Sequence, residues 1–285
     1  MSNGERIHTI GRNWTFATML NKVPEVTLAF WIIKIMSTTV GETGADYLAV
    51  HAGLGTALTD ALMLALLIAS LLLQLQAREY VPWRYWLTVV LVSVVGTQIT
   101  DALTDGLEIS LYASTAAFAV ALAATFAVWY AVERTLSIHT IITARRELFY
   151  WTAILFTFAL GTAAGDLATE ALQLGFRLGV IVFGALIAIV TLAYGRGANP
   201  ILTFWIAYVL TRPLGASLGD LLAQSRTYGG VGFGTTLTSI AFLTVIIALV
   251  TLASFGAIGA VRRPETIKLA IDREELRDRE ESRRE

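Results

Sequence analysis

The chain contains eight apolar runs of about 20 residues, and this feature restricts its possible folds more than any other. A run of this length, wound as an α-helix, spans a hydrocarbon core of about 30 Å. The runs are rich in Leu and Ala and lack the two-residue alternation of barrel strands, so we expect an all-α integral membrane protein. The runs cover approximately 26–48, 54–76, 85–107, 111–132, 149–171, 176–194, 201–223 and 235–260.

The composition agrees with a membrane protein. Hydrophobic residues make up 55% of the 285 residues and charged residues 15%, whereas charged residues make up about 25% of soluble domains. The formal net charge of -1 provides no basic patch for nucleic acid, so we exclude nucleic-acid binding. Since the chain has no cysteine, disulfides, thiolate metal sites and cysteine nucleophiles are excluded as well.

The basic residues of the connections predict an orientation. Every second connection carries Lys or Arg, beginning with the segment before the first run, whereas the alternate connections hold only Arg177 and Arg226. The positive-inside rule then assigns both termini to the cytoplasm, which an even number of spans permits. We expect a cytoplasmic N-terminal segment (1–25), a transmembrane domain (26–260) and a charged cytoplasmic tail (261–285).

A four-fold internal repeat is the strongest pattern in the sequence. An aromatic residue followed by Trp opens every odd-numbered run, a glycine comes ten residues after each Trp, and an aspartate comes five residues after each glycine. Because each copy holds two spans, all four enter the membrane in the same direction. We predict parallel two-helix repeats, pseudo-symmetric about the membrane normal, at about 22–84, 85–146, 147–200 and 201–260.

The aromatic and small residues of the motif have structural explanations. We interpret Trp31, Trp86, Trp151 and Trp205 as anchors at the membrane interface, which amphipathic rings favour. Four residues after each motif glycine comes another small residue, and such pairs let helix backbones approach closely. The odd-numbered helices are therefore expected to contact one another at the glycines, which are Gly41, Gly96, Gly161 and Gly215.

The four motif aspartates are the candidate functional residues. Each lies about 22 Å of helical rise beyond its Trp, which is inside the hydrocarbon core and toward its outer side. A charge there costs at least about 2.5 kcal/mol, so it should face the bundle interior, a partner or water. We predict that Asp46, Asp101, Asp166 and Asp220 bind or translocate an ion.

Further acids lie one helical turn from three of these aspartates. Glu42, Asp105 and Glu170 are candidate second ligands or proton carriers. The fourth copy has Ala216 where the others have Glu42, Thr97 and Thr162, and it alone adds Arg212 within its span. We predict that Arg212 and Lys34 are counter-charges to the acids, and that the four copies do different jobs.

The ligand chemistry favours hard cations. Carboxylate, Thr and Gln oxygens suit Mg²⁺, Ca²⁺ or Mn²⁺ better than Zn²⁺ or Cu²⁺, and neighbouring carboxylates in an apolar site can also carry protons. A divalent cation held by Asp46, Asp101, Asp166 and Asp220 is therefore the expected metal, and we expect no other cofactor. In the structural alternative, the same aspartates cap outer connections or pair with Lys34, Arg177 and Arg212.

Short stretches of the chain resemble known families. Lys22 to Asp46 (KVPEVTLAFWIIKIMSTTVGETGAD), with FALGTAAGD at 158–166 and LTRPLGASLGD at 210–220, resembles a bacterial family described as uncharacterised membrane-anchored proteins. This resemblance covers the membrane part and implies a location in the cell inner membrane. The glycine-aspartate pairs are also similar to acidic motifs of some manganese and calcium exporters, which implies a divalent cation.

These features lead to two hypotheses. The first is a membrane transport protein for a cation, with or without proton coupling, whose partners are the lipid bilayer and the ion. The alternative is a non-transporting scaffold or partner subunit with structural carboxylates. An enzyme is not expected, because HExxH and an evident Ser/His/Asp set are absent. We expect the glycine-rich stretch 229–234 to be a flexible outer loop, and the oligomeric state stays open.

Overall fold

The computed structural model describes residues 21–46 and 55–256. Eight α-helices of 19 to 24 residues fill this part of the chain, and no strand occurs in it. The tail 261–285 and most of the N-terminal segment 1–25 lie outside the described residues. The helices are α2 (Leu28–Asp46), α3 (Thr56–Gln76), α4 (Pro82–Asp101), α5 (Leu111–Glu133), α6 (Ala144–Asp166), α7 (Gly175–Gly195), α8 (Pro200–Ala223) and α9 (Thr235–Ser254).

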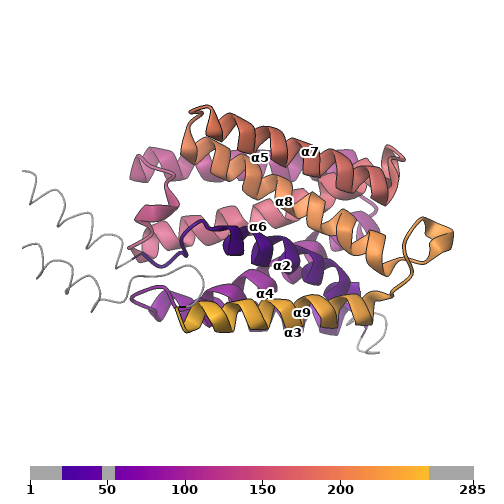
Figure 1. The fold of residues 1–285 in the computed structure, drawn as a ribbon, viewed down its shortest axis with the longest axis horizontal. Coiled ribbons are helices and arrows are strands. Elements are labelled where there is room, and N and C mark those ends of the chain that lie inside the picture. The colour runs from indigo at the N-terminus through magenta and orange to yellow at the C-terminus, as the bar shows by residue number, and fades with distance from the viewer. Residues whose placement is uncertain (1–20, 47–54, 257–285) are drawn as a thin grey trace, which may run out of the picture.

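The helices form two layers around one axis. The first helix of each repeat (α2, α4, α6 and α8) lies in the middle of the bundle, and the second (α3, α5, α7 and α9) lies outside (Figure 1). In the most apolar stretches of α4, α6 and α8, 50 to 61% of residues are buried, against 11 to 17% in the outer helices. The four inner helices therefore form the core.

The order of contacts closes the inner helices into a ring. α2 packs against α4, α4 against α6, α6 against α8, and α8 against α2. Each outer helix packs on the inner helix of the next repeat, so that α3 covers α4, α5 covers α6, α7 covers α8, and α9 covers α2. This cyclic order is consistent with four parallel copies of one helical hairpin around a common axis.

Local signals determine where the helices begin. Pro82 and Pro200 occupy the first turns of α4 and α8, where a missing N–H costs little. Asn199 Oδ1 accepts hydrogen bonds from the next two free N–H groups of α8, at 2.9 and 3.1 Å. Thr143 Oγ1 accepts a bond from the Arg146 N–H at 3.3 Å and starts α6 at Ala144, five residues before the predicted apolar run.

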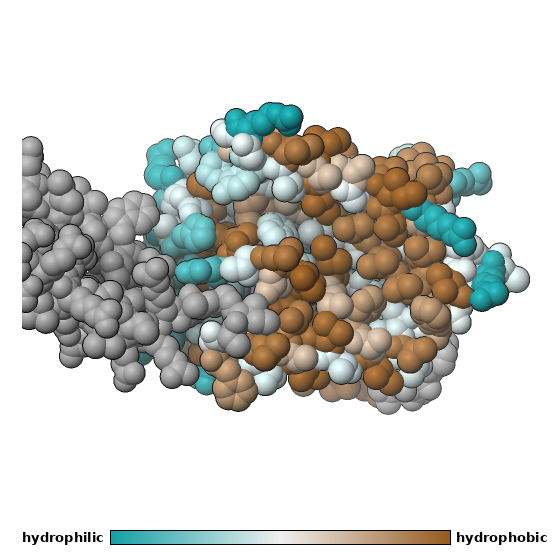
Figure 2. Space-filling view, viewed as in Figure 1, coloured by the Kyte–Doolittle hydropathy of each residue, from teal (hydrophilic) through white to brown (hydrophobic). Residues whose placement is uncertain are grey.

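The surface of the bundle is apolar along most of its length. Seven of the described helices, α3 to α9, are long and apolar enough to cross a membrane, and α2 contains a shorter apolar segment, Leu28–Gly41. Large apolar side chains of the outer helices, such as Ile181 and Ile247, are exposed. Hydrophobic residues cover the middle of the face in Figure 2, and most hydrophilic residues lie toward its two ends. This distribution is compatible with a multi-pass membrane protein.

The two ends of the bundle differ in charge. We call the end at which α4, α6 and α8 begin the basic end, because its connections carry Arg78, Arg84, Arg134, Arg145, Arg146 and Arg196. At the opposite end, the acidic end, the inner helices finish near Asp101, Asp166 and Asp220. The described chain begins and ends at the basic end (Figure 1).

A buried ion pair joins three segments at the basic end. Lys22 Nζ donates to Glu147 Oε2 at 2.7 Å and to the Leu75 carbonyl at 3.1 Å. Gln74 Nε2 donates to Glu147 Oε1 at 3.2 Å. The side chains of Lys22 and Glu147 are only 8% and 1% exposed. The segment before α2, the end of α3 and the start of α6 are therefore fixed to one another.

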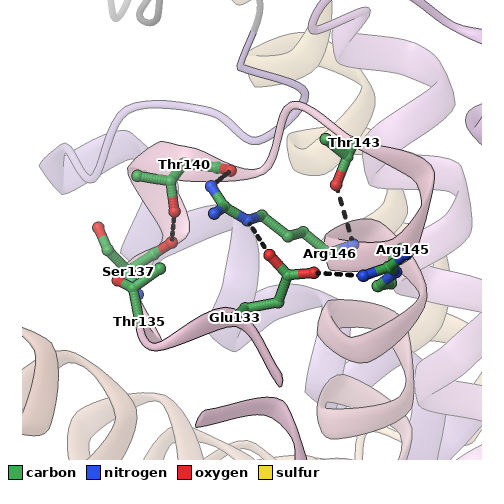
Figure 3. Close-up of polar contacts among 7 residues, drawn as sticks. All are labelled: Glu133, Thr135, Ser137, Thr140, Thr143, Arg145 and Arg146. Carbon is green, nitrogen blue, oxygen red and sulfur yellow. Dashed lines mark hydrogen bonds and ion pairs between the residues drawn. The ribbon is translucent and has the colours of Figure 1, made fainter. Parts of the chain in front are cut away.

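A second polar network holds the connection between α5 and α6 (Figure 3). Glu133 pairs with Arg146 Nε at 2.7 Å and with Arg145 at 3.8 Å. Arg146 also donates from Nη1 to the Thr140 carbonyl at 3.1 Å. Arg134, with φ 58°, ends α5 in the left-handed conformation. Glu133 therefore pairs with two of the basic residues at this end.

Candidate functional site

The motif glycines form close contacts between the inner helices. Positions in each repeat are counted from the motif Trp, so the glycine is position 10 and the aspartate position 15. A methyl group added at Gly96 would lie 2.7 Å from Cβ of Phe158, which leaves no room for it. Each glycine faces position 7 of the next repeat, and the pairs are Gly41 with Ser93, Gly96 with Phe158, Gly161 with Arg212, and Gly215 with Thr38. The predicted contact at the glycines is confirmed.

Aromatic pairs close a second ring, nearer the basic end. The residue before each Trp packs against the Trp of the next repeat, with ring centroids 5.5 to 6.2 Å apart. Trp86, Trp151 and Trp205 are only 3 to 5% exposed. The interpretation of these three as interface anchors is wrong, because they pack between helices. The pairs are Phe30 with Trp86, Tyr85 with Trp151, Tyr150 with Trp205, and Phe204 with Trp31.

One residue next to this ring has a shifted pKa. Tyr80 lies in the connection between α3 and α4 and accepts a hydrogen bond from Trp86 Nε1 at 3.1 Å. Burial raises the pKa of the Tyr80 phenol. The hydroxyl is therefore neutral at ordinary pH and serves as a fixed polar contact for the Trp.

Side chains fill the axis between the aromatic ring and the aspartates. Positions 3, 7, 11 and 15 are spaced by four residues and form one stripe along each inner helix. All eight side chains at positions 3 and 7 are fully buried. Position 3 holds Lys34, Val89, Ile154 and Tyr208, and position 7 holds Thr38, Ser93, Phe158 and Arg212. The axis is therefore packed, and two of its buried side chains are basic.

Arg212 connects its own repeat with all three others. Its Nη1 donates to the Thr38 carbonyl of repeat 1 at 2.8 Å. Its Nη2 donates to Thr97 Oγ1 of repeat 2 and, at 2.6 Å, to Thr162 Oγ1 of repeat 3. Thr97 and Thr162 both occupy position 11, so the guanidinium extends one turn from position 7 toward the acidic end. A single side chain of repeat 4 thus ties the ring together at its axis.

Lys34 lies one turn nearer the basic end. Its Nζ is 4.0 Å from the ring centroid of Phe158 and 4.4 Å from that of Tyr208, a cation-π arrangement. Arg212 Cζ lies 5.7 Å from the same Phe158 ring. Among the described side chains, Lys34 Nζ has no hydrogen-bond acceptor and no carboxylate in an ion pair. Both predicted counter-charges are therefore buried on the axis, and their pairing with acids stays a prediction.

The predicted acids lie at the acidic end with different exposure. Asp101, Asp166 and Asp220 are partly exposed and end the axial stripes of α4, α6 and α8. Asp105 and Glu170 are exposed. The side chains of Glu42 and Asp46 lie outside the described part. The structure thus brings one carboxylate from each of three repeats to one end of the ring.

Two of these aspartates are followed by the same uncommon turn. The helix after Asp101 widens to a π-helix over Ala102–Gly106, and the helix after Asp166 does so over Leu167–Ala171. Glu108 and Gln173 then take positive φ angles of 54° and 55° at equivalent positions. π-Helical turns are rare and occur often at functional sites. The second acids, Asp105 and Glu170, belong to these turns.

A metal centre is not visible in the described part of the chain. Over residues 21–46 and 55–256, no three His, Asp or Glu side chains with described positions come close enough to hold a metal ion. That search does not include Glu42 and Asp46, two of the predicted ligands. The predicted divalent site at Asp46, Asp101, Asp166 and Asp220 therefore stays a prediction.

Three residues in or beside the ring were missed by the reasoning from sequence. Ser93 and Phe158 occupy position 7 and contact the motif glycines, but a Ser and a Phe in an apolar run give no signal of their own. Asp60 is half-buried in the second turn of α3, which packs on α4. A lone carboxylate in a 21-residue apolar helix could have been noticed by its cost in a membrane.

Comparison with known families matches the chain four times. One family model, described as Repeat of Unknown Function (DUF347), matches residues 29–80, 84–135, 149–196 and 203–256. The matches cover more than half of the chain, and each spans one inner helix and the outer helix that follows it. No curated protein and no solved structure matches the chain.

Proposed function

The chain belongs to the DUF347 repeat family, and because its repeats close into a ring with carboxylates at one end, we propose that it transports a small cation across a membrane. The proposed ion is divalent, such as Mn²⁺, Ca²⁺ or Mg²⁺. The observation that carries the proposal is that Asp101, Asp166 and Asp220 lie at the same end of three successive helices of the ring. Asp46 contributes the fourth carboxylate by its position in the repeat.

The proposed location is the cell inner membrane, with both termini in the cytoplasm. Seven apolar helices and the exposed apolar side chains of the outer layer support a membrane location. The connections at the basic end carry six arginines, against Arg177 and Arg226 at the acidic end. Under the positive-inside rule, the basic end faces the cytoplasm and the acidic end faces outward.

The carboxylates supply the chemistry that a hard cation needs. Oxygen ligands with negative charge suit Mg²⁺, Ca²⁺ and Mn²⁺. Asp105 and Glu170 follow in the π-helical turns and can serve as second ligands or proton acceptors. The π turns support this role, because they re-aim side chains immediately after Asp101 and Asp166.

The packed axis supports a carrier rather than an open channel. Every side chain at positions 3 and 7 is fully buried, so no ion passes along the axis unless the inner helices move. In the proposed mechanism, Glu42 neutralises Arg212, because it occupies in repeat 1 the position of the two Thr partners of Arg212. The ion then binds only at the acidic end until the helices rearrange.

A scaffold without transport is the second candidate. Arg212 joins the four repeats, and the same packing that blocks an open channel would suit a purely structural bundle. In that case the aspartates stabilise the ends of the inner helices, and the ion has no role. The two candidates differ in what happens when one carboxylate loses its charge.

Flux in liposomes tests the proposal. The purified protein is reconstituted and assayed separately for Mn²⁺, Ca²⁺, Mg²⁺ and H⁺ movement. Asp166→Asn keeps the shape of the side chain and removes its charge, so a carrier stays folded and loses at least about tenfold in flux. Glu108→Gln is the matched control, because it removes an exposed carboxylate at the same end. No flux of any of these ions, or equal flux in both variants, would reject transport at this site.

A further inference from the structure

A groove at the acidic end is separate from the axis. It has a volume of about 720 Å³ and lies between the first turn of α7 and the connection from α8 to α9. From α7 it is lined by residues 174–178, and from the connection by Arg226 and residues 228–231. Neither segment takes part in the proposed transport site.

The groove holds the only two basic residues of the acidic end in the described chain. Arg177 and Arg226 are both exposed, and neither makes an ion pair with another described residue. Arg226 Nε donates to the Val231 carbonyl at 3.4 Å, and both residues line the groove. Two unneutralised guanidinium groups facing one hollow attract an anion, and guanidinium binds phosphate through paired hydrogen bonds.

The backbone adds to this positive potential. α7 begins at Gly175, and no side chain caps its first N–H groups. The free N–H groups and the helix dipole make the start of a 21-residue helix favourable for negative charge. The arginines and the helix start line the same groove, so their effects add.

The connection that forms the other wall is held in place by backbone hydrogen bonds. Val231, Phe233 and Gly234 donate to the carbonyls of Leu221, Leu222 and Ala223 at 2.7, 2.9 and 3.1 Å. Gly230 is buried, and a side chain there would approach Gln224 Cβ to 2.9 Å. The glycine-rich stretch 229–234 is therefore a loop that is folded back on the end of α8, and its predicted flexibility stays a prediction. A preformed wall lowers the ordering cost of binding.

Most of the other side chains of the lining are apolar or aromatic. Leu174, Phe176, Leu178, Tyr228 and Val231 lie beside the arginines. Leu178 is 50% exposed at the start of an outer helix that is apolar along its length. A ligand with a phosphate and a hydrocarbon chain would match both halves of the groove, whereas a free anion would use only one.

From this arrangement we propose that the groove binds the phosphate of an anionic lipid headgroup, with the start of the acyl chains along the apolar lining. Arg177 and Arg226 hold the phosphate, and the first turn of α7 adds backbone donors. The inference does not depend on transport, because none of these residues belongs to the carboxylate site.

Lipid binding to the purified full chain tests this inference. The protein is exchanged into phosphatidylcholine nanodiscs, and binding of added phosphatidylglycerol is measured by native mass spectrometry. The double variant Arg177→Gln/Arg226→Gln should bind phosphatidylglycerol at least tenfold more weakly than the unchanged chain. The control Arg78→Gln/Arg196→Gln removes two exposed arginines at the basic end and should bind within twofold of the unchanged chain.

Three results would overturn the inference. If the protein retains phosphatidylcholine as strongly as phosphatidylglycerol, the headgroup charge is not recognised. An equal loss in the control variant would show that net charge alone attracts the lipid. Displacement of phosphatidylglycerol by millimolar inorganic phosphate would show that the groove binds a free anion instead. Circular dichroism of both variants verifies that the helices are intact.

Discussion

Repeats 2 and 3 share several features around the axis, whereas repeats 1 and 4 depart from them. Repeats 2 and 3 share a Tyr before the motif Trp, a Thr at position 11 and a π-helical turn after the aspartate. Repeats 1 and 4 have Phe before the Trp and place the two buried basic residues, Lys34 and Arg212, on the axis. The two buried basic residues of the axis thus belong to repeats 1 and 4, and the two position-11 hydroxyls belong to repeats 2 and 3.

This difference between the copies allows the repeats to fit together at the axis. Four identical copies would put four equal side chains at every level of the axis, and a guanidinium at each position 7 would not be tolerated. Because Arg212 occurs once, the hydroxyls of repeats 2 and 3 and a carbonyl of repeat 1 can all serve it. The unequal copies therefore complement one another, and changes in the two pairs of repeats should have unequal effects.

Removing Arg212 should have the largest effect. Arg212→Met keeps most of the volume but deletes the hydrogen bonds to the other three repeats, and we expect a loss of about 3 kcal/mol in the free energy of unfolding. Unfolding by sodium dodecyl sulfate in mild detergent, followed by Trp fluorescence, measures it. Arg196→Met, an exposed residue at the basic end, should change stability little. A stable Arg212→Met protein would show that repeat 4 does not hold the ring together.

A methyl group at one of the close helix contacts should have the next largest effect. Gly161→Ala places a carbon against Cβ and Cγ of Arg212, and overpacking of this kind costs about 2 kcal/mol. Gly184→Ala in the outer helix α7 is the matched control, because nothing lies within 4 Å of the added carbon. That control should gain up to about 1 kcal/mol from helix propensity. The same assay compares both variants, and equal values would contradict the close contact in the ring.

The two position-11 threonines test the likeness of repeats 2 and 3. Thr97→Val and Thr162→Val each remove one hydrogen-bond acceptor for Arg212 Nη2. Each variant should lower the free energy of unfolding by about 1 kcal/mol. If the repeats are interchangeable here, the two losses agree within error. A clearly larger loss of stability for one variant would show that Arg212 is held mainly by the repeat that carries this threonine.

The smallest effect should come from the tyrosine pair. Tyr85 and Tyr150 hydrogen-bond through their hydroxyls at 2.5 Å, while repeats 1 and 4 have Phe at the same positions. Tyr85→Phe should lower the free energy of unfolding by about 0.6 kcal/mol, a typical value for a side-chain hydrogen bond between membrane helices. The double variant with Tyr150→Phe should lose no more than the single one, since both changes break the same bond. Additive losses would indicate separate partners.

The helices and their repeat could be predicted from the sequence, because both follow from local patterns. Apolar length located eight helices, and fixed spacing from Trp31 to Asp46 and in its three copies predicted the repeats. The packing of each outer helix on the next repeat could not be predicted, because it depends on how hairpins dock. The burial of Trp86, Trp151 and Trp205 was missed for the same reason: an aromatic residue near a helix start suits a lipid interface and a helix interface equally.

The candidate site was predicted in part. Motif spacing identified Asp101, Asp166 and Asp220, and the structure brings them to one end of the ring. It also identified Arg212 as unusual, but not its hydrogen bonds to Thr38, Thr97 and Thr162, which belong to segments far apart in the sequence. Long-range contacts of this kind follow from the ring order, which no single repeat encodes.

The packing of α9 on α2 has a consequence for how the chain is made. A ribosome produces α2 before α9, so the first inner helix remains uncovered on this side until the fourth repeat has been made. Until then Lys34 lacks Tyr208, which comes from the last repeat and forms one of its two aromatic contacts. Premature termination after repeat 3 would leave this helix permanently uncovered on the side of the missing repeat, so truncated products should be removed by membrane quality control rather than accumulate as partial bundles.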